Sequence, residues 1–150
     1  GGFGFILGDE GSGGVLGKQL MSDYLHKAMP NHLWQKLQEN YKLSPNLILD
    51  KVYRQSYPNR FLAAFAPFIH QNIQEIYMKT LIKTHFQSFF DRKVLCYEQS
   101  LQLPIHFTGS IAHYFQQLLK EVAESNQLQI GNIVQHPIEG LIRYHQKKMN

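Results

Sequence analysis

The sequence predicts an α/β domain that is rich in helices and has a small sheet. Its 150 residues are 43% hydrophobic and 17% charged, a composition typical of a globular chain. Over most of its length apolar residues recur at spacings of three and four, the pattern of amphipathic helices. In the last third, two strand-like segments are each followed by a helical pattern, which favours a parallel sheet covered by helices.

The first predicted elements are a strand, a glycine-rich loop and a helix. The apolar run Phe3–Leu7 is typical of a short buried strand. The segment Gly8–Gly14 predicts a loop, because four of its seven residues are glycine. From about Gly14 the four-residue spacing of Leu16, Leu20 and Tyr24 indicates a helix.

Two further helices follow in the first half of the chain. Apolar residues between Leu33 and Tyr41 mark one of them, after the break at Pro30 and Asn31. Ser44 and Pro45 open the next, with serine as the N-cap and proline at the first helical position.

The middle of the chain is also expected to be helical. Pro58 and Asn59 start one element, and Pro67 is expected to kink or break it because proline lacks a backbone N–H. The segment from Ile73 to Phe90 predicts one long helix.

The last third alternates strands and helices. Leu103–Thr108 predicts a strand that enters the turn Gly109–Ser110, and Ile111–Val122 predicts a helix. Leu128–Val134 predicts a second strand, and His136–Pro137 opens a final helix. With the first predicted strand these form a small mixed sheet, and we expect that sheet to be only partly complete.

Charge and cysteine content exclude several classes of protein. The formal net charge is +4 without a basic stripe, so we expect no nucleic-acid partner. The single cysteine, Cys96, excludes a disulfide framework and a cluster held by cysteines of this chain, and it fits a cytoplasmic protein. No apolar stretch is long enough to span a bilayer, so we expect no membrane partner.

The glycine-rich loop is the first candidate site. It lacks the pattern of a Walker A loop, since Gln19 follows Lys18, and Leu16 stands where a dinucleotide fingerprint needs its third glycine. The adjacent carboxylates of Asp9 and Glu10 would repel a bare phosphate but suit sugar hydroxyls or a metal–phosphate complex. A tight turn with acidic residues near a helix N-terminus explains the pattern equally well.

Three further positions are weaker candidates. Gly109–Ser110 could hold a ligand at the carboxyl edge of the sheet, although a turn with Ser110 as N-cap is the more frequent explanation. His113 lies three residues after Ser110 and could face the same ligand. Gly140 inside a helix indicates close packing or a nearby ligand. No histidine spacing indicates a metal site, and no Ser-His-Asp arrangement is evident.

Four segments together resemble a known family. GGFGFILGDEGSGGVLG, PNRFLAAFAPFI, IHFTGSIAHYF and PIEGLIRYH resemble, in this order, the C-terminal half of N-acetylglucosamine kinase-like proteins of the BadF/BadG/BcrA/BcrD ATPase group, of the Bacteroides type. That group belongs to the actin, Hsp70 and sugar kinase superfamily. The resemblance implies a ribonuclease H-like, actin-like ATPase domain and transfer of the γ-phosphoryl of MgATP to the 6-hydroxyl of the sugar.

The resemblance also implies roles for individual residues. Gly2 and Phe3 match a Gly-Trp/Phe pair at the sugar site, and Asp9 matches the acidic residue that binds sugar hydroxyls, with Glu10 assigned beside it. The remaining implied residues are assigned to the nucleotide: Gly11, Ser12, Gly109, Ser110, His113 and Gly140. No catalytic residue and no metal ligand is assigned in this chain.

The family's phosphate loop and general base belong to an N-terminal domain that this sequence lacks. We therefore interpret residues 1–150 as the C-terminal domain of a two-domain kinase, inactive alone and prone to pair with a second copy. Its expected partners are that domain, a sugar and MgATP. Two alternatives remain, a non-kinase ATPase of the same group and a sugar sensor without catalysis. Phe3 also stands where better-known kinases have tryptophan, which leaves the identity of the sugar open.

Overall fold

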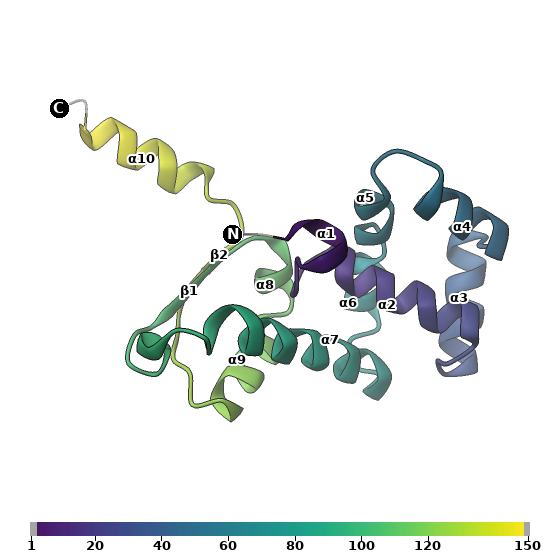
Figure 1. Ribbon diagram of the computed structural model, residues 1–150, viewed down its shortest axis with the longest axis horizontal. Helices are drawn as coiled ribbons and strands as arrows, with labels where there is room; N and C mark the ends of the chain where they lie inside the picture. Colours follow the sequence, from purple (N-terminus) through teal and green to yellow (C-terminus); the bar gives the residue numbers. More distant parts are fainter. Residues whose placement is uncertain (1–2, 149–150) are drawn as a thin grey trace. The chain divides into compact units, whose positions relative to one another are not determined.

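The computed structural model describes residues 3–148, without the side chains of Glu139, Arg143, Lys147 and Lys148. The chain divides into two compact units, Gly1–Phe89 and Phe90–Asn150. The first unit consists of helices: α1 (Gly4–Leu7), α2 (Gly13–His26), α3 (Asn31–Tyr41), α4 (Pro45–Tyr53), α5 (Pro58–Ala63), α6 (Ala66–Gln71) and α7 (Ile76–Phe89) (Figure 1). The second contains η1 (Phe90–Val94), η2 (Glu98–Leu101), β1 (Ile105–Thr108), α8 (Ser110–Tyr114), α9 (Gln116–Ser125), β2 (Ile130–Val134) and α10 (Ile138–Lys148).

Helix α2 is the centre of the first unit and packs against α5, α6 and α7. Its contact with α5 is unusually close, because a Cβ atom at Gly17 would lie 1.8 Å from the backbone oxygen of Leu62. Only glycine lets the two backbones approach to this extent. The surrounding core includes the fully buried Leu16, Leu20 and Phe65.

Helix ends in this unit follow the expected capping chemistry. The Ser12 hydroxyl accepts a hydrogen bond from the Val15 backbone N–H at 3.2 Å, at the start of α2. Ser44 caps α4 in the same way through Leu47 N–H at 3.2 Å, with Pro45 at the first position as predicted. These bonds satisfy N–H groups that have no partner within their own helix.

The strand predicted over Phe3–Leu7 is wrong. Residues Gly4–Leu7 form a single helical turn, closed by a hydrogen bond from Gly8 N–H to the Gly4 oxygen at 3.0 Å. Ile6 and Leu7 are 68% and 77% exposed, so the apolar run is not buried. No strand in residues 3–148 pairs with this segment, and a turn satisfies backbone groups that an unpaired strand would leave open.

Proline and asparagine define the boundaries of α6 and α7. The predicted break at Pro67 is confirmed: α5 ends at Ala63, and α6 restarts at Ala66 with Pro67 in its first turn. The predicted long helix begins three residues late, at Ile76, because the chain turns at Asn72. Asn72 is buried, donates to the Phe68 oxygen at 2.7 Å and accepts from Lys36 Nζ at 2.7 Å.

In the second unit β1 and β2 are parallel and lie side by side (Figure 1). The described sheet therefore consists of two parallel strands, not the predicted mixed sheet of three. The register pairs Ile105 with Ile130 and Phe107 with Ile133, and it is irregular between Ile105 and Phe107. There, the His106 ring covers Gly131, and its Nδ1 accepts a hydrogen bond from Asn132 N–H at 2.9 Å.

The predicted helix over Ile111–Val122 is interrupted. Phe115, 1% exposed, has a non-helical backbone and separates α8 from α9. The predicted apolar stripe is otherwise confirmed, since Leu118, Leu119 and Val122 are buried. The final helix α10 begins directly after Pro137, and its apolar residues Ile138, Leu141, Ile142 and Tyr144 are all at least half exposed.

Candidate functional site

The glycine-rich loop forms a compact turn at the start of α2. The Ser12 backbone N–H donates to the Asp9 oxygen at 3.1 Å, and the Ser12 oxygen accepts from Leu16 N–H at 3.2 Å. The structure therefore brings Asp9, Glu10, Gly11 and Ser12 together in one turn, as the sequence predicts. Gly13, the first residue of α2, is buried beneath it.

Two residues of this turn have left-handed backbone conformations. Gly11 has φ +79°, and a Cβ there would be 3.3 Å from the ring of Phe89, so the loop lies directly on the end of α7. Asp9 has φ +68°, a conformation that costs an L-residue about 1–2 kcal/mol and that aspartate tolerates better than most. Backbone strain can accompany a ligand site, although the same conformation also occurs outside this loop, for example at Lys27 and Lys42.

The two adjacent carboxylates are in different environments. The Asp9 side chain is exposed to solvent, whereas the Glu10 side chain is partly buried and its Oε2 is buried. Glu10 also interacts with residues of the protein itself. Asp9 is thus the carboxylate that a dissolved ligand can reach, and Glu10 is turned toward the interior of the loop.

Phe3 lies just before α1 and is 72% exposed. A ring with that accessibility offers an apolar face to a ligand or to another protein surface. Gly2, which the resemblance pairs with Phe3, lies outside the described residues.

The second candidate site is the turn between β1 and α8. Gly109 has φ +127° and no atom within 4 Å of a built Cβ, so its backbone is open to close approach from one side. Ser110 is exposed and is the first residue of α8; Gly109 is the N-cap and Ser110 makes no capping hydrogen bond. The interpretation of Ser110 as an N-cap is therefore wrong.

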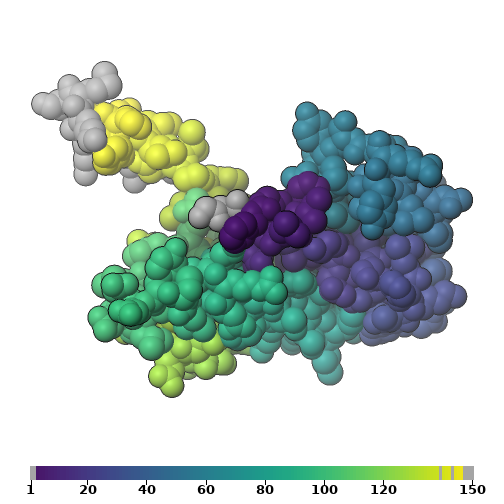
Figure 2. Space-filling model, in the orientation of Figure 1, coloured from purple at the N-terminus to yellow at the C-terminus, as the bar shows by residue number. Residues whose placement is uncertain are grey.

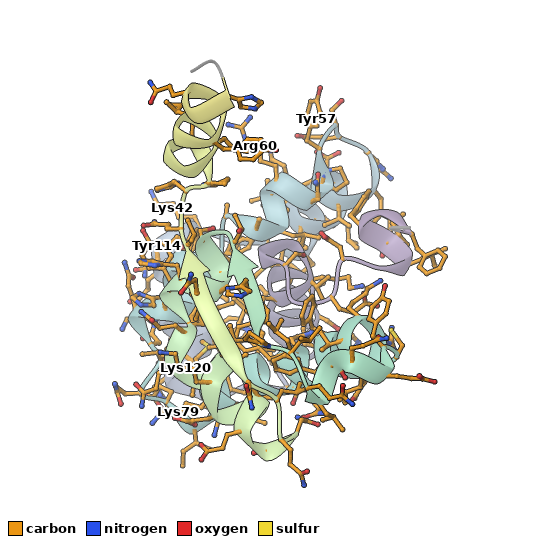
Figure 3. The ribbon with its side chains drawn as sticks, turned by 90° about the vertical axis from the view of Figure 1, so that its left-hand side faces the viewer. Lys42, Tyr57, Arg60, Lys79, Tyr114 and Lys120 are labelled. Carbon is orange, nitrogen blue, oxygen red and sulfur yellow. The ribbon has the colours of Figure 1, made fainter. Side chains whose placement is uncertain are left out.

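His113 lies one turn further along α8. Its ring is partly buried and meets the ring of Tyr114 edge-on, with centroids 5.3 Å apart. The hydroxyl of Tyr114, which is labelled in Figure 3, accepts a hydrogen bond from Gln135 Nε2 at 3.0 Å, which ties α8 to the residue that follows β2. The second unit thus places Gly109, Ser110 and His113 on one short segment.

Gly140 is not explained by packing. It lies in α10, and no described atom comes within 4 Å of a Cβ built there. The close-packing interpretation is wrong, because the position faces open space. Its assignment to a nucleotide stays a prediction.

Titratable groups cluster between α2 and α7. The Tyr77 hydroxyl donates to Asp23 Oδ2 at 2.6 Å, and Gln19 Nε2 donates to Oδ1 at 2.8 Å. Burial, followed by the bond to Asp23, raises the pKa of Tyr77 far above its usual value. Burial and the charge of Lys18 lower the pKa of His85, although Asp23 opposes the shift.

Sequence reasoning missed several contacts that shape these sites. Nothing in the local pattern shows that Gly17 is needed for the crossing of α2 and α5, because Leu62 lies 45 residues later in the chain. The contact of His106 with Gly131 was missed for the same reason. A polar row on one face of α2 could have been predicted from the sequence, because Lys18, Ser22 and His26 follow one another at four-residue spacing.

The described residues contain neither a metal-ligand cluster nor a membrane-spanning helix. Between residues 3 and 148 no group of three or more histidine, cysteine, aspartate or glutamate residues is arranged to hold a metal ion. In the same part of the chain no helix has the length and apolar character needed to cross a membrane.

Comparison with solved structures shows a clear similarity. The chain superposes with a TM-score of 0.93 on a crystal structure from Porphyromonas gingivalis that is provisionally described as an N-acetylglucosamine kinase. The two sequences are 40% identical, and the match covers 98% of the length of this chain and 52% of the length of the Porphyromonas gingivalis protein. The chain thus spans about half the length of this relative. No protein-family description matches the chain, and no curated protein is significantly similar to it.

Proposed function

We propose that the full-length protein is an ATP-dependent sugar kinase that phosphorylates N-acetylglucosamine, or a related hexosamine, on its 6-hydroxyl. The observation that carries this proposal is the 40% identity, with a TM-score of 0.93, to a protein provisionally described as an N-acetylglucosamine kinase. Because the chain spans 52% of that protein, the activity belongs to the full-length protein. We expect residues 1–150 alone to be inactive.

In this proposal the glycine-rich loop binds the sugar. The exposed carboxylate of Asp9 accepts hydrogen bonds from sugar hydroxyls, and each such bond to a charged group contributes about 1.5–3 kcal/mol. Glu10 is partly buried and supports the loop from inside. The exposed ring of Phe3 packs against the apolar face of the sugar ring.

The nucleotide is assigned to the turn that includes Gly109 and Ser110. The open space at Gly109 is compatible with a nucleotide, because adenosine could approach the backbone there without meeting a side chain. ATP supplies the phosphoryl group, and this chain contributes positioning only. We assign no protein ligand in this chain to the magnesium ion of MgATP.

The test is sugar-dependent release of ADP by the full-length protein at saturating MgATP. N-acetylglucosamine, glucosamine and glucose are compared with a sample that contains no sugar. A rate well above background with N-acetylglucosamine supports the kinase. ADP release that is equal without sugar favours a non-kinase ATPase, and no release with any sugar favours a sensor; either result overturns the proposal.

A further inference from the structure

A pocket of about 520 Å³ lies within the first unit, and Asp9 is not among its lining residues. Most of its lining residues belong to α2 and α4, and Phe5 and Ile6 of α1 and Leu62 of α5 complete the lining. In Figure 2 the dark purple atoms of α1 lie over the start of α2, beside the blue atoms of the α4–α5 region. Its volume is within the range of sites for small molecules, about 300–1,000 Å³.

Most of the lining is apolar. Ile48, Leu49, Val52 and Tyr53 of α4 form one wall, and Met21 and Leu25 of α2 face into the same space. Leu49 and Tyr53 are 47% and 79% exposed, which leaves part of this apolar wall in contact with water. A ligand that covered this wall would gain free energy from the removal of that area from water.

Apart from the Tyr53 hydroxyl of α4, the polar side chains of the pocket lie along α2. Lys18, Ser22 and His26 follow each other at four-residue spacing and therefore share one face of the helix. His26 Nδ1 lies 2.8 Å from the Ser22 backbone oxygen. A carbonyl oxygen can only accept, so Nδ1 carries a hydrogen and Nε2 is the ring nitrogen left to face a ligand.

The charge in this pocket has one sign. None of its lining residues is acidic. Asp23, the acidic residue of α2, is bonded to Tyr77 and Gln19 instead, and Asp50 of α4 is bonded to Gln55. Lys18 forms no salt bridge with any residue that the structure describes.

We propose that this pocket binds an aliphatic monocarboxylate. The hydrocarbon chain lies against the wall formed by α4, and the carboxylate accepts hydrogen bonds from Lys18 and Ser22. From Gly14 to His26 the lined face of α2 extends about 18 Å, at 1.5 Å per residue, which suits an extended chain better than a compact ring. A sugar is a poor occupant, because the apolar wall would leave most of its hydroxyls without partners.

The test uses the 150-residue chain labelled with [methyl-¹³C]methionine and titrated with decanoate below the concentration at which it forms micelles. Met21 lines the pocket, whereas Met29 and Met78 are buried elsewhere in the described residues and serve as internal controls. We expect the Met21 methyl signal to shift saturably while the signals of Met29 and Met78 stay in place. N-acetylglucosamine should leave the Met21 signal unchanged, which separates this site from the sugar site.

Two variants and two related ligands isolate the role of charge. Lys18→Gln should weaken decanoate binding about tenfold or more, because it removes a hydrogen bond between charged groups. Lys120→Gln, an equally conservative change at an exposed position on α9 (Figure 3), should have no effect. Leu49→Asp places a carboxylate in the apolar wall and should abolish binding. Decanol should bind more weakly than decanoate, and decylammonium more weakly still.

Three outcomes would overturn the proposal. Decylammonium that binds as tightly as decanoate would show that the pocket does not select for negative charge. Equal loss of affinity in the Lys18 and Lys120 variants would show that the cation on α2 has no special role. Shifts of all three methionine signals together, or of none, would show that the pocket is not the site of binding.

Discussion

Replacement of Gly17 by alanine tests the close contact between α2 and α5 in the first unit. A Cβ atom at this position would lie 1.8 Å from the Leu62 oxygen and 2.5 Å from its carbonyl carbon. Ordinary contacts begin at 3.4 Å, so α2 and α5 would have to separate by about 1.6 Å, the difference between these two distances. Both obstructing atoms belong to the backbone, and no side-chain rotation can relieve the clash.

The expected loss follows from two opposing effects. Alanine is favoured over glycine inside a helix by about 1 kcal/mol. Overpacking of a well-packed core typically costs about 1–3 kcal/mol, and a clash with backbone belongs at or above the upper end of that range. We therefore expect Gly17→Ala to lower the free energy of unfolding by about 2 kcal/mol in net.

Urea unfolding followed by tryptophan fluorescence measures this loss. The chain has one tryptophan, Trp34, which stacks on Tyr24 at 5.1 Å and therefore reports on the first unit. With a slope of about 2 kcal/mol per molar urea, the midpoint should fall by about 1 M. Gly14→Ala is the matched control on the same helix, because its Cβ would meet the Asn59 oxygen at an ordinary 3.6 Å.

The two alanine variants should change the urea midpoint differently. Gly14→Ala should keep the wild-type midpoint or raise it slightly, since it adds helix propensity without a clash. If Gly17→Ala proved as stable as Gly14→Ala, the close approach of α2 and α5 would be refuted, and the packing of the first unit would have to be revised.

Three further predictions concern the loop and the protonation of His85. Asp9→Asn should lower kcat/KM for N-acetylglucosamine in the full-length protein by about tenfold or more. The urea midpoint should stay unchanged, because asparagine also tolerates positive φ. Glu124→Gln, on the exposed face of α9, is the control, and an unchanged kcat/KM for Asp9→Asn would contradict the sugar-binding role. Ser12→Ala should destabilise the chain by about 1 kcal/mol through loss of the N-cap bond to Val15, measured by the same urea titration, and an unaltered midpoint would count against that cap. The pKa of His85 is lowered below 6.5 in the folded state, so the unfolded chain binds more protons below that pH and stability should fall as the pH drops from about 7.5 to 5.5. His85→Gln should flatten this dependence, and equal slopes for the two proteins would refute it.

Local signals in the sequence were sufficient to predict most helices of the first unit. Caps such as Ser44 with Pro45, and the break at Pro67, act through groups a few residues away, so their effect can be predicted without knowledge of the tertiary structure. The same holds for the parallel pair β1 and β2, since a strand that is followed by a helix and a second strand favours that arrangement.

Predictions failed where the outcome depends on distant partners. The apolar run Phe3–Leu7 has strand-like composition, but a strand needs a neighbour, and the described residues supply none. Phe115 interrupts a regular helical stripe, which its spacing alone does not reveal. The contact between Gly17 and Leu62 likewise depends on how two helices cross, and no local pattern encodes that crossing.

The candidate site shows the same division between local and distant causes. The turn from Asp9 to Ser12 is encoded locally, by the glycines and by the serine cap. The fold alone gives no reason for a carboxylate at position 9, because glycine would adopt φ +68° without strain and the Asp9 side chain is exposed to solvent. Positive φ also occurs at Lys27, Lys42, Tyr57 and Gln127, so it does not by itself mark a ligand site. For Asp9 two explanations therefore stand side by side, the sugar binding proposed above and a tolerated loss of stability of about 1 kcal/mol. Asp9→Gly separates these two explanations, since it should raise the urea midpoint of the chain while the full-length protein loses its response to sugar.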